Sequence, residues 1–183
     1  MRCIIAMMFA CLVSMSLHAA DTELKLFRPF GEAALIVRET HAGECWQQSQ
    51  HIKREDAWRC MADGKSYDPC FIRQYGDQKQ ALCPQSPWDG TSAQLDLSVP
   101  ADNTRHVPLD MSQTYPWGLE LQSGETCLAI DEGQMFDGMP IRYQCNNQTL
   151  IFGRLQRCKM PWSILQRDSK GQVETAIIKK AWF

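Results

Sequence analysis

Cysteine is the residue type with the most chemistry to offer in this chain. The sequence contains nine cysteines. Cys3 and Cys11 lie in an apolar stretch at the start, and the others are Cys45, Cys60, Cys70, Cys83, Cys127, Cys145 and Cys158. None of them forms the Cys-x-x-Cys pair that is typical of a tight zinc site. Disulfide bonding is the chemistry we expect, provided that the chain reaches an oxidising compartment.

Residues 1–20 have the layout of a secretory signal peptide. Arg2 supplies a positive charge, residues 3–17 are almost wholly apolar, and Ala19 and Ala20 are small residues suited to cleavage. An apolar stretch of about 15 residues is short for a transmembrane anchor, which needs about 20. A lipoprotein anchored at Cys11 is disfavoured by the bulky Phe9. We expect cleavage near Ala20 and a periplasmic or secreted protein.

Cleavage leaves an odd number of cysteines, so at least one thiol has no partner within the chain. Spacing alone allows on the order of 100 ways of forming three bridges. We favour sequence neighbours, because each such bridge closes a loop of about 15 residues, worth about 3 kcal/mol. The favoured pairs are Cys45–Cys60, Cys70–Cys83 and Cys127–Cys145, with Cys158 as the candidate free thiol.

Two reactive roles for Cys45 compete with the disulfide. Cys45 is followed by Trp46, as in papain-like proteases, but the flanking glycine and second cysteine of that motif are missing. The last histidine of the chain, His106, also lies too close to Cys45 in sequence to be the catalytic histidine of that motif. A zinc site built from His41, Cys45 and His51 would have irregular spacing, and oxidation would consume its thiol. We expect no metal ion and no cofactor.

Other catalytic patterns are weak. His41, His51 and His106 lie among polar residues and are expected at the surface. Neither a Gly-x-Ser-x-Gly nor a His-Glu-x-x-His motif occurs, although a Ser-His-Asp triad is spatial and leaves no sequence trace. Carboxylates could pair for glycoside hydrolysis, the candidates being Glu120, Asp131 and Glu132; a solvated strand face is the simpler reading of Glu120. We assign no catalytic residue.

The aromatic residues include six tryptophans. Trp117 and Trp162 follow prolines and open alternating runs, which predicts core positions. Trp46 and Trp58 flank cysteines and are expected to pack against disulfides.

Trp88 is the best candidate for an exposed binding residue, because it lies in the turn-like sequence Ser-Pro-Trp-Asp-Gly. Tyr115 is a second, weaker candidate.

Short alternating runs separated by turn signals dominate the rest of the chain. Leu95, Leu97 and Val99 alternate with polar residues, and residues 117–121 repeat this pattern. Turns are expected at 123–125, 137–138, 146–147 and 170–171, and residues 51–57 form one helical turn or a loop. We therefore expect a mainly β protein: a single disulfide-braced domain over 21–183, antiparallel, sandwich-like or barrel-like, with little helix.

Charge narrows the range of partners. The chain has 19 basic and 21 acidic side chains, and removal of Arg2 leaves 18 basic ones. Because no run of Lys or Arg is present, the sequence argues against a nucleic-acid partner.

Several stretches resemble a set of uncharacterised secreted bacterial proteins. The matching segments are C-W-x-x-S from Cys45, D-A-W-R-C-M from Asp56, Y-D-P-C-F from Tyr67 and P-W-G-L-E-L-x-S-G-x-x-C from Pro116. The resemblance covers most of residues 21–183. Its cysteine order supports the three neighbour pairs and leaves Cys158 outside the pattern. It implies an architecture and a compartment, and no activity.

Three functional hypotheses follow. The first is a non-catalytic exported protein that blocks a protein partner in the cell envelope, such as an inhibitor or immunity protein against a cell-wall-degrading enzyme. Cystine bridges suit this role, because rigidity lowers the ordering cost of binding. The second is a module that binds glycan or cell envelope through Trp88. The third is a secreted hydrolase with a spatially assembled site.

Overall fold

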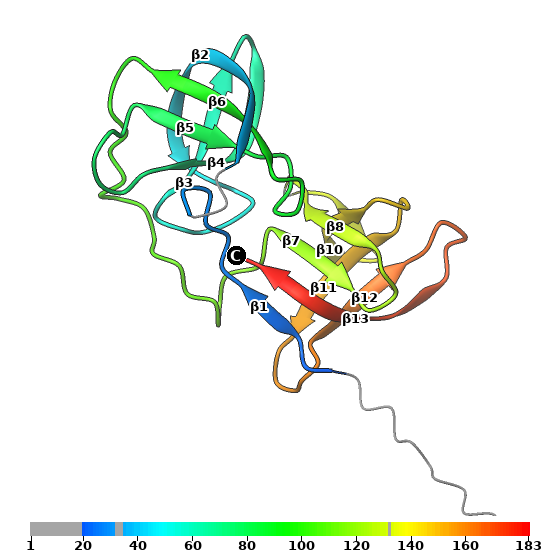
Figure 1. Cartoon of the computed structure of the whole chain (residues 1–183). Coiled ribbons are helices and arrows are strands. Elements are labelled where there is room, and N and C mark those ends of the chain that lie inside the picture. The colour runs from blue at the N-terminus through cyan, green and yellow to red at the C-terminus, as the bar shows by residue number, and fades with distance from the viewer. Residues whose placement is uncertain (1–19, 32–34, 132) are drawn as a thin grey trace, which may run out of the picture.

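The computed structural model describes residues 20–31, 35–131 and 133–183. All regular secondary structure in these ranges is β-strand, so they contain no helix that could cross a membrane. The strands form two barrel-like sheets that lie against one another (Figure 1). The chain is therefore mainly β, as its alternating pattern predicts. The proposed signal peptide falls almost entirely outside the described residues.

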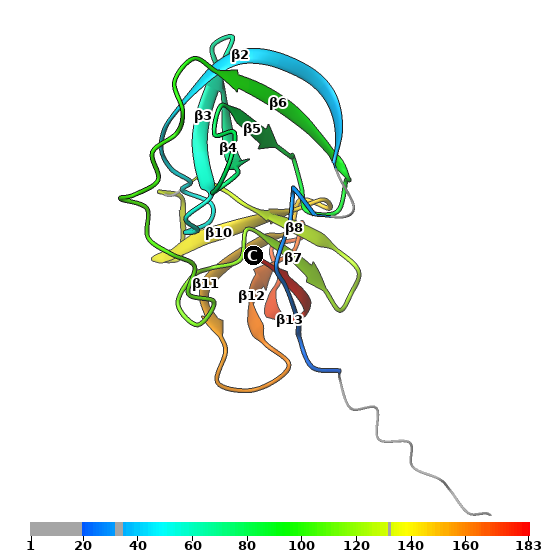
Figure 2. The same ribbon diagram turned by 60° about the vertical axis from the view of Figure 1, so that its left-hand side comes forward.

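The N-terminal barrel is a five-stranded meander of β2 (Ile36–Gln48), β3 (Ala57–Ala62), β4 (Lys65–Ile72), β5 (Gln80–Cys83) and β6 (Thr91–Leu97). Successive strands are antiparallel, so the first and fifth run in the same direction. The long curved β2 consequently closes the barrel by pairing with β6 in parallel (Figure 2). This parallel closure departs from the antiparallel pairing that local sequence suggests.

The C-terminal barrel contains β7 (Gly118–Leu121), β8 (Thr126–Ala129), β10 (Met139–Cys145), β11 (Leu150–Gln156), β12 (Ser163–Arg167) and β13 (Val173–Trp182). Its strands are antiparallel neighbours, and β13 pairs with both β12 and β7, which closes the ring. The short β9 (Met135–Phe136) pairs with β10, and β1 (Glu23–Lys25) lies parallel to β13. The chain start is thereby attached to the C-terminal barrel.

Each disulfide joins neighbouring antiparallel strands. Cys45 lies opposite Cys60 on β2 and β3, and Cys127 lies opposite Cys145 on β8 and β10. The third bridge, Cys70–Cys83, links β4 to β5. These are the three sequence-neighbour pairs that we favoured. Cys158 is exposed and unpaired among the described cysteines.

Side-chain burial follows most of the predicted alternation. Trp117 and Trp162 are buried in the core, as expected. Val99 is instead 71% exposed, because β6 ends at Leu97 and the alternation has no structural meaning beyond that residue. Trp58 is buried in a cluster that contains Cys60, as its place beside a cysteine predicts, whereas Trp46 is 46% exposed on β2.

A shared core joins the two barrels. Phe71 of the N-terminal barrel packs with Phe27 and Trp117, at ring-centroid distances of 5.2 and 5.9 Å. The buried Arg54 guanidinium reaches across this junction and donates to the backbone oxygens of Phe27 (2.8 Å) and Phe183 (3.1 Å). The relative position of the barrels is thus set by packing and by hydrogen bonds.

Candidate functional site

A cleft of about 470 Å³ opens at the junction of the two barrels. One wall is the loop between β2 and β3, residues 50–53. The other walls are residues 113–116 of the connection between the barrels and the β8–β10 side of the C-terminal barrel, including Ile130 and Arg142. The cleft lies where two rigid units meet, which is a common position for binding sites.

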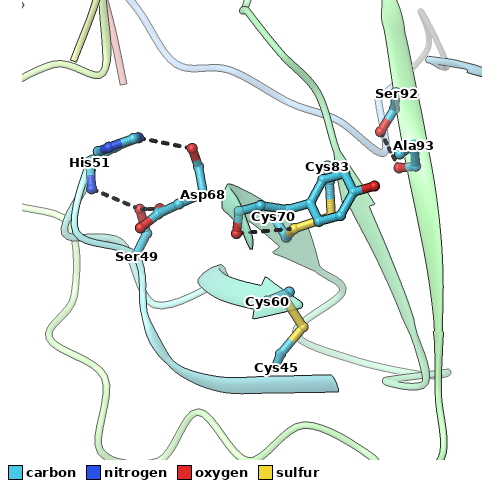
Figure 3. Close-up of a disulfide and its surroundings, with 10 residues drawn as sticks. Cys45, Ser49, His51, Cys60, Asp68, Cys70, Cys83, Ser92 and Ala93 are labelled. Atoms are coloured by element: carbon cyan, nitrogen blue, oxygen red, sulfur yellow. Dashed lines mark hydrogen bonds between the residues drawn. A yellow bond between two sulfur atoms is a disulfide. The ribbon is translucent and has the colours of Figure 1, made fainter. Parts of the chain in front are cut away.

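Ser49, His51 and Asp68 form a hydrogen-bond network on the N-terminal side of the cleft (Figure 3). The Ser49 hydroxyl donates to the Asp68 carboxylate, and the second oxygen of that carboxylate accepts from the Gln50 N–H at 3.0 Å. Ser49 Oγ also accepts from the backbone N–H groups of His51 and Ile52, both at 3.1 Å. The network ties the β2–β3 loop to β4.

The three residue types of a catalytic triad are therefore close together, but their connections differ from those of a triad. His51 Nδ1 lies 2.8 Å from the backbone oxygen of Asp68, and Nε2 lies 3.2 Å from Asp131 Oδ1. Both ring nitrogens face acceptors, and neither faces the Ser49 hydroxyl. Ser49 is fully buried. A triad histidine must instead accept the proton of an accessible nucleophile.

The His51–Asp131 contact links the two barrels across the mouth of the cleft. Asp131 follows β8, and its side chain is 66% exposed, whereas the His51 side chain is 17% exposed. Both His51 contacts are hydrogen bonds only when both ring nitrogens carry protons, because a carbonyl and a carboxylate are acceptors. Exposed ion pairs of this kind contribute little to stability, so its main effect is positional.

Tyr115 lies in the opposite wall of the cleft between two arginines. The guanidinium carbons of Arg142 and Arg157 lie 4.1 and 5.3 Å from the centre of its ring. Arg142 Nε donates to the Gly153 oxygen at 3.0 Å, which fixes the stack to β11. Tyrosine and arginine in such fixed arrangements are common among interface residues that dominate binding energy.

Burial shifts the pKa values of two groups beside this stack. Desolvation raises the pKa of Tyr143, whose hydroxyl donates to the Pro116 oxygen at 2.8 Å, so this phenol stays protonated. Desolvation lowers the pKa of Arg157, which donates to the oxygens of Met111 (3.0 Å) and Thr114 (2.6 Å). These bonds anchor the connection between the barrels and are structural.

The structure removes the reactive roles considered for Cys45. Its sulfur is bonded to Cys60, so it is neither a thiolate nucleophile nor a zinc ligand. His41 lies elsewhere, 2.7 Å from an Asp63 carboxylate oxygen. Residues 20–31, 35–131 and 133–183 contain no cluster of three or more ligating side chains.

The remaining expectations for polar residues need correction. His41, His51 and His106 are all partly buried, and the His106 ring lies tilted against Trp58 with ring centroids 4.1 Å apart. Glu120 is no solvated carboxylate, since it accepts from Trp182 Nε1 at 3.0 Å and pairs with Lys180 at 3.1 Å. Glu132 lies outside the described residues.

The two predicted binding residues occupy different places. Tyr115 lines the cleft, whereas Trp88 is partly buried and packs against Gly118, outside the lining of the cleft. Sequence reasoning missed Arg142, because nothing in its local pattern marks an arginine that will stack on a tyrosine 27 residues earlier.

Comparison with known proteins gives no indication of what the cleft binds. No family model, curated protein or solved structure matches the chain.

Proposed function

We propose that this chain is an exported, non-catalytic binding protein that blocks a partner protein of the cell envelope, as an inhibitor or an immunity protein does. The partner class we favour is a cell-wall-degrading enzyme. The observation that carries the proposal is the cleft at the barrel junction, which presents the fixed Tyr115–Arg142 pair while the neighbouring Ser49–His51–Asp68 network is engaged in structural bonds.

Rigidity supports a blocking role. Three disulfides join neighbouring strands, and Arg54 connects the barrels through a buried hydrogen-bond network. A protein that inserts rigid loops into a partner, or receives a partner loop in a fixed cleft, loses little conformational entropy on binding. The same rigidity has no value for an unstructured linker or tail.

The disulfides fit an exported protein, and export in turn supports a partner in the cell envelope. Disulfide bonds persist in the periplasm and outside the cell, and three of them fit such a compartment. Two expectations from the sequence are part of the proposal. One is that residues 1–20 are a signal peptide, and the other is that the chain belongs with the secreted bacterial proteins that carry the C-W-x-x-S and D-A-W-R-C-M motifs.

The experiment compares capture of envelope proteins by the oxidised chain over 21–183 and by a variant with a filled cleft. Gln113 is an exposed residue of the cleft wall, so Gln113→Trp fills the mouth without altering the core. Gln122→Trp places the same ring on an exposed turn away from the cleft. Captured proteins are identified by mass spectrometry, and complexes are sized by gel filtration.

We expect one stoichiometric partner that the parent and Gln122→Trp retain and Gln113→Trp loses. If that partner is an enzyme, its activity falls on addition of the parent chain in a one-to-one ratio. Absence of a stoichiometric partner at about micromolar bait, or equal capture by both tryptophan variants, contradicts the proposal.

A further inference from the structure

A second groove lies beside the cleft at the barrel junction and shares one lining residue with it, Ile130. It has a volume of about 410 Å³, within the range of small-molecule sites. One side is the loop between β5 and β6, which contributes Ser86, Trp88 and Asp89. The other side is the outer face of β8 and the end of β10, which contribute Thr126, Gln144 and Asn146.

Trp88 is held in place at this groove by close contact with the C-terminal barrel. A Cβ atom on Gly118 would lie 3.0 Å from Trp88 Cζ3 and 2.9 Å from Pro87 Cγ, so the loop approaches β7 as closely as a glycine allows. The Trp88 side chain is half-buried by this contact and its remaining surface lines the groove. The indole is therefore a fixed apolar platform.

The polar side chains around this platform have no partners of their own. Asp89, Thr126, Gln144 and Asn146 form no side-chain hydrogen bond to another residue in the described ranges, which contrasts with the engaged residues of the cleft. The Ser86 hydroxyl is buried, with the residue 2% exposed, and also has no partner there. A buried hydroxyl without a partner is costly, and such groups mark places where a ligand or water completes the bonding.

The charge of the groove restricts the ligand. Among the residues that the structure describes, its lining contains no lysine, arginine or histidine, so none of them compensates a phosphate, sulfate or carboxylate. Its hydrogen-bonding groups are hydroxyls, neutral amides and one carboxylate. These groups suit a polyol, because each hydroxyl of a polyol both donates and accepts hydrogen bonds. The indole face of Trp88 in turn suits the C–H face of a pyranose ring.

We propose that this groove binds an uncharged saccharide. One pyranose ring stacks on Trp88, and its hydroxyl groups bond to Asp89, Gln144 and Asn146. These four residues are not part of the lining of the cleft assigned to the protein partner, and the proposal stands independently of that assignment.

The test is a titration of the ¹⁵N-labelled chain over 21–183 with four soluble trisaccharides: chitotriose, cellotriose, maltotriose and mannotriose. The indole N–H signal of Trp88, identified by its loss in Trp88→Phe, reports occupancy of the groove. We expect at least one probe to shift this signal saturably, with a Kd of about 1 mM or below.

A double variant separates groove binding from general contact with sugar. Gln144 and Asn146 are exposed, so Gln144→Ala with Asn146→Ala leaves the core intact and is expected to weaken binding about tenfold or more. Gln156→Ala with Gln172→Ala removes two exposed amides outside the groove and leaves the affinity unchanged. The proposal is overturned if no trisaccharide shifts the Trp88 signal at about 10 mM, or if both double variants bind as the parent does.

Discussion

Arg54 connects the two barrels, and its removal is expected to destabilise the whole molecule. The guanidinium makes a two-bond contact with the Asp56 carboxylate, with Nε–Oδ1 and Nη2–Oδ2 distances of 2.6 Å each. Nη1 donates to the backbone oxygens of Phe27 and Phe183, and the guanidinium carbon lies 4.9 Å from the centre of the Phe71 ring.

The magnitude follows from burial of both partners. The side chains of Arg54 and Asp56 are 8% and 14% exposed, so solvent screens their interaction weakly. Arg54→Met leaves the carboxylate with no cationic partner, and breaking a buried pair in this way costs about 3–5 kcal/mol. For a chain of this size the melting temperature would fall by roughly 6–20 °C.

The assay is urea unfolding followed by tryptophan fluorescence, with thermal melting as a second measurement. Arg54→Met combined with Asp56→Leu is expected to be less destabilised than Arg54→Met alone, because the buried Asp56 carboxylate is removed together with its cationic partner. Arg38→Met removes an exposed arginine and is expected to change stability by less than about 0.5 kcal/mol. The reasoning is refuted if Arg54→Met loses under about 1 kcal/mol or if the double variant is the least stable of the three.

Three further predictions test other parts of the structure. Gly118→Ala is expected to lose about 1–3 kcal/mol in urea unfolding, because the new Cβ would lie 2.9 Å from Pro87 Cγ; unchanged stability would mean that the loop moves freely. Replacement of both Cys127 and Cys145 by alanine is expected to cost about 3 kcal/mol, whereas a loss below about 1 kcal/mol would show that strand pairing alone constrains this hairpin. Burial lowers the pKa of His106 from its usual 6.5, so the unfolded chain binds more protons and stability falls as the pH drops below about 6.5. The difference in urea midpoint between about pH 7.5 and pH 5.5 should shrink in His106→Phe, and an unchanged difference would exclude this histidine as its source.

Strands and disulfides could be predicted from sequence because both are local here. Each bridge joins adjacent strands of a meander, so the partner of each cysteine is also its neighbour in sequence. Period-two alternation marks the inward face of a strand, as at Leu95 and Leu97. The same alternation gives a wrong prediction at Val99, because hydrophobic spacing does not indicate the residue at which strand pairing ends.

The barrel closures and the sites depend on contacts that sequence patterns do not encode. β2 pairs with β6, although β3, β4 and β5 lie between them in the chain. Because successive strands of the meander reverse direction, β2 and β6 run parallel. Arg54 lies in a mixed, charged segment that reads as a surface loop. Its burial depends on Phe27 and Phe183, which come from opposite ends of the described chain.

The two proposed sites depend on the same junction. Arg54 fixes it through Phe27 and Phe183, and the contact of Trp88 with Gly118 fixes it at the saccharide groove. Because these contacts come from different loops and act in different places, together they oppose rotation of one barrel against the other. The geometry of the cleft and of the groove is therefore set before any ligand arrives. Such preorganisation favours recognition by a fixed surface over recognition by induced closure.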